Sequence, residues 1–346
     1  MVPNSSLLRL RIIKGYGDST TIRIRQIHIG DGFMIDIIPI IKTFRGHEFA
    51  EASLRSIYDQ ARRIVYIHSE FGWDGRTGNT VRKIVEAFPD PDKKIVHLTC
   101  PEGLDQTEQY NVTIRYLEKE QLSYSYVQLI DTDEVFDAES WRVVLPYLEK
   151  NATATRPAPA VKMHLWDYIK SPLYRVDPVS KLEPVCFVHK SEVKPGIFAI
   201  RGAGLFNDAI STPAWFHHFT GVRNSLTETW DKLACSGLVE HEPLRDKNEW
   251  VEFVWNRLPS SKMLHPLANH ASCWQGVRVV GVDDLPEILH DHPIVKAWAD
   301  YPAATYSASV DYDKYDLPEG FGPGHPDWNV PSKRNRYKRA LAGGMI

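Results

Sequence analysis

Short apolar runs alternate with longer segments of mixed polarity between residues 34 and 151. Runs rich in β-branched residues are typical of buried strands, and apolar positions three to four residues apart are typical of amphipathic helices. Strands that alternate with helices form βαβ units, so the sequence predicts an α/β fold with a mostly parallel sheet flanked by helices. The expected strands cover residues 34–42, 63–69, 94–100 and 124–136, and the expected helices cover 47–61, 80–88, 107–121 and 138–151.

The rest of the chain is less regular. Residues 1–33 end in the alternating sequence TTIRIRQIHIG, which predicts a β extension ahead of the main domain. The main domain is expected to cover residues 34–298, divided into halves at 34–150 and 151–298, and to be followed by an irregular tail at 299–346. In the second half, short strands are expected at 160–166, 183–189 and 196–202, and helices at 225–237 and 248–258.

The composition narrows the possible functions. The 346 residues include 41 basic and 44 acidic ones, and the net charge of −3 gives no global field that would draw the chain to nucleic acid or to an anionic membrane. There is no apolar run of about 18 residues and no apolar segment of signal-peptide length at the start, so we expect no membrane span. The four cysteines are too widely spaced for a CxxC zinc site, which indicates buried free thiols and a cytoplasmic location.

Two carboxylates close the fourth expected strand, in the sequence Asp131-Thr132-Asp133. Because side chains alternate along a strand, Asp131 and Asp133 are expected to point the same way, at the sheet edge where ligands bind in open α/β folds. Carboxylate oxygens are hard ligands that suit Mg²⁺ or Mn²⁺ shared with a diphosphate. The alternative for Asp133 is a helix N-cap, a role that Asp137 fills better.

Several segments around this turn resemble the GT-A fold glycosyltransferases of the family-2 type, over roughly residues 34–298. The matching segments lie at 56–60 (SIYDQ), 68–77, 109–111 (QYN) and 215–223 (WFHHFTGVR), and the closing stretch at 285–293 is also similar. One departure is that Ser69-Glu70 stands where this family usually has paired aspartates.

The resemblance implies a site and a reaction. It implies that Asp133 binds the metal, that Asp131 contacts the ribose or reaches the metal through water, and that His218 completes the metal site, with His217 as the alternative. The further candidates are Glu70 and Asp74 for the base or ribose, Asn111 for packing or sugar contact, Arg223 for the diphosphate, and Trp166 for sugar or base stacking.

The predicted function is therefore a metal-dependent glycosyltransferase that moves a sugar from a nucleotide diphosphate to a hydroxyl acceptor. Mn²⁺ or Mg²⁺ is the expected cofactor, a UDP-sugar the first candidate donor, and inversion the expected outcome, with retention left open. An inverting enzyme needs a general base near the acceptor. Asp208 is preferred for this role, ahead of Asp167, and Glu183 and Glu192 are further candidates.

Three alternatives stay open at this point. The acceptor is either a glycan or another hydroxyl compound, or a hydroxymethylated base of DNA. If the acceptor is DNA, the basic residues 333–339 would bind its phosphates. A nucleotidyltransferase would share the sheet and the acidic ligands, although residues 42–48 (KTFRGHE) hold only one glycine for a phosphate loop. A non-catalytic carbohydrate-binding protein could have the same fold without metal.

Overall fold

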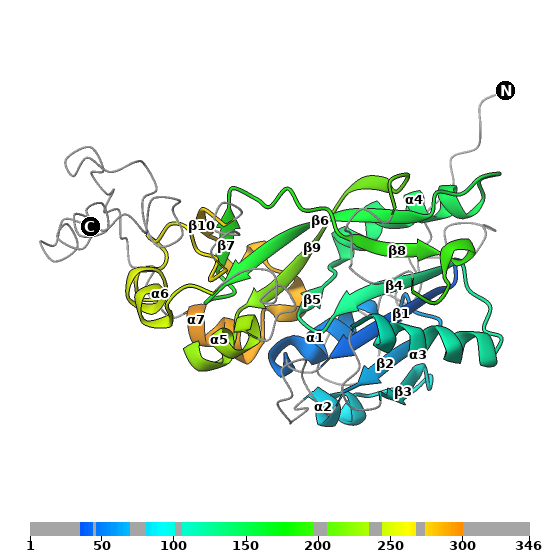
Figure 1. Ribbon diagram of the computed structural model, residues 1–346, viewed down its shortest axis with the longest axis horizontal. Coiled ribbons are helices and arrows are strands. Elements are labelled where there is room, and N and C mark those ends of the chain that lie inside the picture. The colour runs from blue at the N-terminus through cyan, green and yellow to red at the C-terminus, as the bar shows by residue number, and fades with distance from the viewer. Residues whose placement is uncertain are drawn as a thin grey trace, which may run out of the picture.

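The computed structural model describes residues 35–43, 46–69, 81–100, 106–196, 206–234, 244–267 and 274–299 (Figure 1). The expected β extension at 1–33 and nearly all of the expected tail at 299–346 lie outside the described residues, as do Glu70 and Asp74. The strands and α-helices are β1 (Ile37–Thr43), α1 (His47–Tyr58), β2 (Ile64–His68), α2 (Val81–Ala87), β3 (Ile95–Thr99), α3 (Gln106–Lys119), β4 (Tyr126–Asp131), β5 (Glu134–Val135), α4 (Ala138–Ala152), β6 (Ala160–Ile169), β7 (Tyr174–Asp177), β8 (Val185–His189), β9 (Ile210–Gly221), α5 (Leu226–Ala234), α6 (Lys247–Phe253), β10 (Gly276–Val279) and α7 (Pro293–Ala299).

The strands form one mixed sheet in the order β10-β7-β6-β8-β4-β1-β2-β3, and β9 pairs with both β5 and β6. The four strands β3, β2, β1 and β4 are mutually parallel, and β1 lies between β2 and β4. Their carboxyl ends therefore meet at one edge of the sheet, where Lys42 of β1 is in register with Asp131 of β4. This confirms the predicted α/β class with a parallel central sheet flanked by helices. β7, β8 and β10 add antiparallel pairs.

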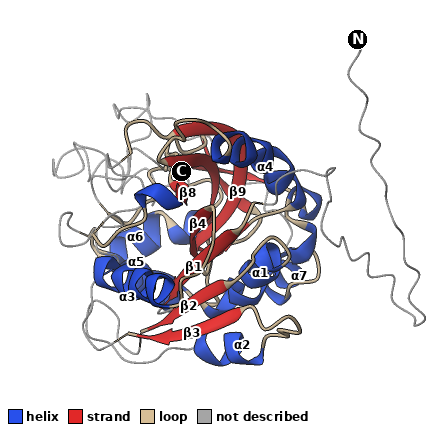
Figure 2. Ribbon diagram, turned by 90° about the vertical axis from the view of Figure 1, so that its right-hand side faces the viewer, coloured by secondary structure: helices blue, strands red, loops and turns tan. Residues whose placement is uncertain are grey.

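The helices cover both faces of the sheet, with α1, α2 and α4 on one side and α3 on the other (Figure 2). The alternation of side chains along β1 explains this arrangement. Ile37 and Ile41 pack with Leu54 of α1 in one core cluster, whereas Ile38 and Ile40 pack with residues of α3 in another. Every position of β1 from Ile37 to Ile41 is therefore buried, as a strand covered on both faces requires.

The long strand β9 is among the elements that the sequence pattern did not predict, and it shapes the site. It runs parallel to β6 and antiparallel to β5. In this register His218 lies opposite Asp167 on one side and opposite Glu134 on the other. The predicted cap of α4 is confirmed, since the Asp137 side chain accepts a hydrogen bond from the Ser140 backbone N–H.

The C-terminal part of the described chain packs against the start of α1. The rings of Phe49 and Phe219 stack with centroids 4.4 Å apart, and His292 stacks on the other side of Phe49 at 5.2 Å. His292 also contacts the Glu48 carbonyl oxygen through Nε2, at 2.8 Å. The first turn of α1 is thereby fixed between β9 and the segment that precedes α7. No helix among the described residues is long and apolar enough to cross a membrane.

Candidate functional site

The acidic turn lies at the carboxyl edge of the parallel strands, between β4 and β5. Asp131 ends β4, and its Oδ1 atom is 2.7 Å from Nζ of Lys42 at the end of β1. The connection from β1 to α1 approaches the turn so closely that a Cβ atom on Gly46 would lie 2.8 Å from Oγ1 of Thr132. Gly46 also has φ +117°, a conformation that side chains with a Cβ rarely adopt. Glycine at this position lets the start of α1 pack directly on the acidic turn.

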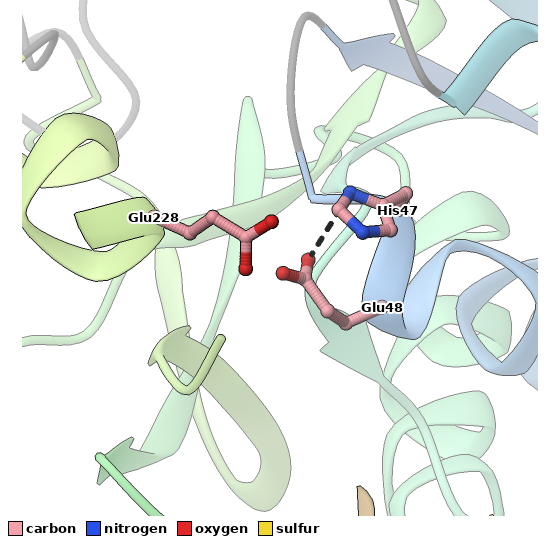
Figure 3. Close-up of side chains that lie close together, drawn as sticks. All are labelled: His47, Glu48 and Glu228. Carbon is pink, nitrogen blue, oxygen red and sulfur yellow. Dashed lines mark ion pairs between the residues drawn. The ribbon is translucent and has the colours of Figure 1, made fainter. Parts of the chain in front are cut away.

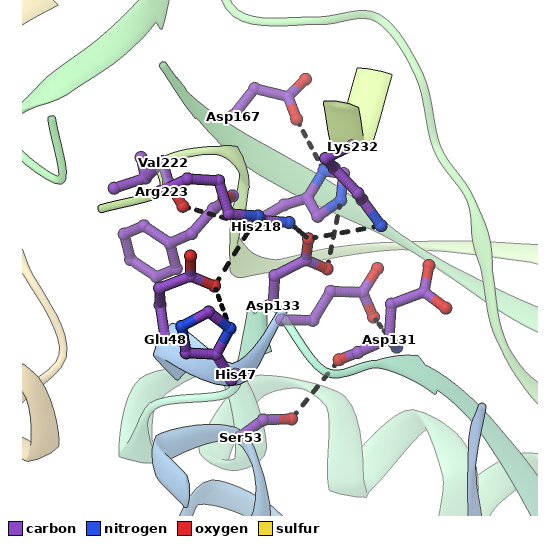
Figure 4. A network of polar contacts seen from close by, with 12 residues as sticks. His47, Glu48, Ser53, Asp131, Asp133, Asp167, His218, Val222, Arg223 and Lys232 are labelled. Atoms are coloured by element: carbon purple, nitrogen blue, oxygen red, sulfur yellow. Dashed lines mark hydrogen bonds and ion pairs between the residues drawn. The ribbon is translucent and has the colours of Figure 1, made fainter. Parts of the chain in front are cut away.

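Asp133 is buried in a group of positive charges (Figure 4). Its Oδ2 atom accepts a hydrogen bond from Nη2 of Arg223 at 2.6 Å and lies 3.9 Å from Nζ of Lys232. Its Oδ1 atom lies 3.9 Å from Nε2 of His218. Burial raises the pKa of the Asp133 carboxyl, but the charges of Lys232 and Arg223 outweigh this effect and hold it well below its usual range. Asp133 is therefore an ionised carboxylate in the protein interior.

His218 is held between two carboxylates, Asp167 of the neighbouring strand β6 and Asp133 of the acidic turn. Its Nδ1 atom is 2.7 Å from Oδ1 of Asp167, and its Nε2 atom faces Asp133. Burial lowers the pKa of His218, but the hydrogen bond to Asp167 and the negative charges of Asp167, Asp133 and Glu134 outweigh it and raise the pKa to about 9. The described arrangement thus holds an imidazolium, which must lose its proton before Nε2 can bind a metal ion.

The Arg223 guanidinium makes its contacts with groups inside the protein. Nη1 donates to the carbonyl oxygens of Phe219 and Val222, at 2.9 and 2.6 Å, and Nη2 donates to Asp133. Nε lies 3.7 Å from Oε2 of Glu48, and the Arg223 side chain is 2% exposed. The sequence predicted that Arg223 steadies a diphosphate, but in the described structure it is the internal counter-ion of Asp133.

The two carboxylates of the turn do not converge. Asp131 is the last residue of β4, whereas Asp133 lies in the turn that follows, so the strand alternation used for the prediction does not extend to Asp133. Asp131 pairs with Lys42 while Asp133 pairs with Arg223, and Figure 4 shows them on different sides of the turn. Among the described residues, Asp131, Asp133 and His218 do not offer three ligand atoms that all lie within 4.8 Å of one another.

The predicted metal nevertheless fits two of these residues. Oδ1 of Asp133 and Nε2 of His218 are 3.9 Å apart. Two bonds of about 2.1 Å together exceed that separation, so one ion could be held by both atoms. The donor set of one carboxylate and one imidazole suits Mn²⁺ better than Mg²⁺. The predicted metal role of Asp133 and His218 stays a prediction that this geometry accommodates.

Two other predicted residues lie elsewhere. Asp208 is exposed in the turn before β9. The β9 segment from Ile210 to His218 lies opposite Val161 to Asp167 of β6, which spans about 20 Å of strand. Asp208 therefore cannot serve as base for a reaction at His218 in this structure, whereas Asp167 contacts His218. Asn111 is buried, donates to Glu108 at 3.0 Å and accepts from the Gly196 backbone N–H at 2.8 Å, which is the packing role foreseen for it.

Trp166 lies away from the cluster. It neighbours Asp167 along β6, so its side chain leaves the opposite face of the sheet. There it stacks on Trp215 with ring centroids 4.0 Å apart, and the Arg175 guanidinium lies 4.1 Å from its ring centre. His217, the alternative ligand, is also on that face, with Nδ1 2.9 Å from the Tyr168 hydroxyl oxygen. The structure therefore gives Trp166 and His217 structural partners.

Sequence reasoning missed three residues of the cluster, namely Lys42, Glu48 and Lys232 as a partner of Asp133. The position of Lys42 could have been found, because it ends the strand beside β4 in a parallel sheet. Glu48 carried no such signal, since an acidic residue in the first turn of a helix is ordinary.

Comparisons with known proteins show a distant likeness only to solved structures. No model of a known protein family matches the sequence. No curated protein matches it either. The mannosyltransferase PcManGT from Pyrobaculum calidifontis, in complex with GDP-Man and Mn²⁺, is 13% identical with a TM-score of 0.39, over 90% of this chain and 76% of that one. GalNAc-T7 with UDP, GalNAc and Mn²⁺ is 11% identical with a TM-score of 0.36, over 77% and 56% of the two chains. The inositol-1-phosphate CTP transferase from T. maritima is 8% identical with a TM-score of 0.30, over 59% and 98%.

Proposed function

We propose that this chain is a metal-dependent glycosyltransferase of the GT-A type that moves a sugar from a nucleotide diphosphate, with a UDP-sugar as first candidate, to a hydroxyl acceptor. The observation that carries the proposal is the meeting of Asp133, His218 and Asp167 at the carboxyl edge of the parallel strands. These residues come from three separate segments of the chain. A catalytic role explains why an ionised carboxylate and a partly exposed histidine are brought together at a ligand-binding edge.

Asp133 and His218 would hold Mn²⁺ or Mg²⁺ through Oδ1 and Nε2, and Asp131 would contact the ribose or reach the ion through water. When bound, the ion supplies positive charge that stabilises the departing nucleotide diphosphate. Lys42 and Lys232 lie beside Asp131 and Asp133, so they add positive charge on the two sides of the turn. Arg223 holds the Asp133 carboxylate in place rather than binding the diphosphate.

Asp167 could have either of two roles, and the two roles predict different effects of the same substitution. Its hydrogen bond to Nδ1 of His218 turns Nε2 toward Asp133, and this makes it a positioning residue for the metal site. As the general base of an inverting reaction it would instead take a proton from the acceptor hydroxyl. Asp167→Asn should weaken Mn²⁺ binding if it positions His218. It should lower kcat with unchanged Mn²⁺ affinity if it is the base.

The proposal is tested with a panel of nucleotide diphosphate sugars in the presence and absence of Mn²⁺. We expect metal-dependent release of the nucleoside diphosphate from at least one donor, and its loss in Asp133→Asn. Asp291→Asn is the matched control, because that carboxylate is exposed and pairs only with Lys296 in the described structure. Wild-type turnover by Asp133→Asn would refute the site.

The same assay distinguishes the neighbouring hypotheses. A nucleotidyltransferase would join a nucleoside triphosphate to a sugar phosphate and release pyrophosphate, and a binding protein would bind donor without releasing product. The acceptor is proposed to be a glycan or another hydroxyl compound. The DNA alternative rests on the basic residues 333–339, which lie outside the described residues, and predicts binding to hydroxymethylated DNA that weakens steeply with salt.

A further inference from the structure

A second group of candidate ligands lies beside the acidic turn and shares no residue with it. His47 and Glu48 open α1, and Glu228 lies in the first turn of α5. The ligand atoms of these three side chains all lie within 4.8 Å of one another (Figure 3). They therefore form a compact set drawn from the start of two helices that are far apart in the sequence.

Glu48 is the unusual member of this set. Its side chain is 1% exposed, and neither of its carboxylate oxygens has a hydrogen-bond partner. Its Oε2 atom lies 3.7 Å from Nε of Arg223 and 3.8 Å from Nδ1 of His47, and both distances are beyond hydrogen-bond length. Buried carboxylates are nearly always hydrogen-bonded or bound to an ion, so we expect the Glu48 carboxylate to bind a cation.

Glu228 increases the need for a cation. Its Oε2 atom is buried without a hydrogen-bond partner, and Figure 3 shows its carboxylate facing that of Glu48. Arg223 faces Glu48 through Nε alone, because its Nη2 atom already bonds to Asp133 and its Nη1 atom to two backbone carbonyls. Two facing carboxylates, of which only Glu48 lies beside a guanidinium, leave negative charge that a bound cation would balance.

We propose that His47, Glu48 and Glu228 bind a divalent transition-metal ion, separate from the ion proposed at Asp133. One imidazole nitrogen with two carboxylate oxygens suits Zn²⁺ or Mn²⁺ better than Mg²⁺ or Ca²⁺, which prefer oxygen alone. The Asn224 side-chain amide lies 3.2 Å from Nε2 of His47. With its oxygen toward the ring, this amide accepts a hydrogen bond from Nε2–H, and Nδ1 is the ring nitrogen that faces Glu48.

The ion would connect both sides of the acidic turn. It joins the start of α1, where Gly46 packs on Thr132, to α5, which carries Lys232 toward Asp133. This role is structural and goes beyond the proposed transfer reaction. It predicts that metal alone, without nucleotide, raises the melting temperature of the protein.

The test is metal binding by the full chain after chelator treatment, measured with Zn²⁺ alone and Mn²⁺ alone by calorimetry and by metal analysis after dialysis. We expect Glu228→Gln to lose one equivalent of metal, or to bind it at least tenfold more weakly, and His47→Gln to do the same. These two half-buried positions lie on different helices, so a folding defect in one variant leaves the other informative. Glu118→Gln, at an exposed position of α3, is the matched control and should bind as the wild type does.

Asp133→Asn separates this site from the proposed transfer reaction. We expect it to retain the equivalent of metal that Glu228→Gln loses, even if it no longer turns over a donor. The proposal is wrong if Glu228→Gln and His47→Gln both bind metal as the wild type does. It is also wrong if the wild type binds no metal without nucleotide, or if only Asp133→Asn loses the ion.

Discussion

Removing the guanidinium of Arg223 should destabilise the protein strongly, because it would leave Asp133 charged and buried. The suitable substitution is Arg223→Met, which keeps much of the side-chain length while removing the charge and every donor. Asp133 and Arg223 are each 2% exposed at the side chain, so water cannot replace the lost partner without opening the structure. The same change removes the ion pair with Glu48 at 3.7 Å.

The magnitude follows from the contacts. Breaking one partner of a buried ion pair costs about 3–5 kcal/mol. Nη1 also bonds to the carbonyl oxygens of Phe219 and Val222, and each lost hydrogen bond costs about 1 kcal/mol more. Lys232, at 3.9 Å from Asp133, retains part of the neutralising charge and reduces the total. We therefore expect a loss of about 3–5 kcal/mol in the free energy of unfolding.

The measurement is urea unfolding followed by circular dichroism, with Asp133→Asn and the double variant completing a cycle. Asp133→Asn removes the buried carboxylate that Nη2 of Arg223 neutralises and leaves only Glu48 beside the guanidinium, so Arg223→Met should cost less in that background. The coupling should be about 2 kcal/mol or more. A loss below about 1 kcal/mol for Arg223→Met, or additive effects in the cycle, would show that Arg223 does not neutralise Asp133.

Two further predictions concern single titrating groups. Burial opposes the ionisation of Asp137, but hydrogen bonds from His217 and Ser140 lower its pKa to about 2, so its contribution to stability is present above the usual pKa and is lost as the pH falls toward 2. Asp137→Ala should cost about 1 kcal/mol at pH 7, through loss of the α4 cap, and less at pH 2.5, as urea unfolding at the two pH values will show. Burial lowers the pKa of His68 to about 4, and the charges of His97 and Arg82 add to this effect. Between pH 6.5 and 4, His68 is therefore protonated in the unfolded chain but not in the folded chain. The wild type should therefore lose stability from pH 6.5 to 4, and His68→Gln should show a flatter profile; an unchanged slope would contradict the assignment.

The first half of the fold could be predicted because its signals are local. The strand and helix periods between residues 34 and 151 match β1 to α4 within a few residues, and Asp137 announces the start of α4. In the second half, the expected strands at 160–166 and 183–189 and the expected helices at 225–237 and 248–258 correspond to β6, β8, α5 and α6. The strand β9 could not be predicted, because it owes its place to pairing with β6 and β5 rather than to its own pattern. Its sequence ISTPAWFHHFTG contains Pro213 and two adjacent histidines, which obscure the alternation of a strand.

The positions of the candidate site residues divide in the same way between local and long-range signals. Asp133 was found because the end of a parallel strand lies at the ligand-binding edge whatever else the chain does. His218 was found only through family resemblance, and its distance to Asp133 depends on β9. Asp208 was preferred as base because it is ten residues from His218 in sequence. The extended strand β9 lies between the two residues, so they are far apart in space.

The burial of Asp133 explains why the acidic turn alone could not define the chemistry of this site. A solvent-exposed Asp-x-Asp would carry two free carboxylates, and a metal would be their only strong partner. Here Arg223 and Lys232 already neutralise Asp133, while Lys42 neutralises Asp131. A divalent ion must therefore compete with cations of the protein itself, and His218 must release a proton as the ion binds.

The competition should make binding at Asp133 depend on the nucleotide diphosphate, whose negative charges attract Lys232 and add ligands for the ion. At His47, Glu48 and Glu228, by contrast, carboxylates outnumber their fixed cationic partner, so an ion there needs no nucleotide. Nucleotide dependence is thus the property that distinguishes the two proposed ions.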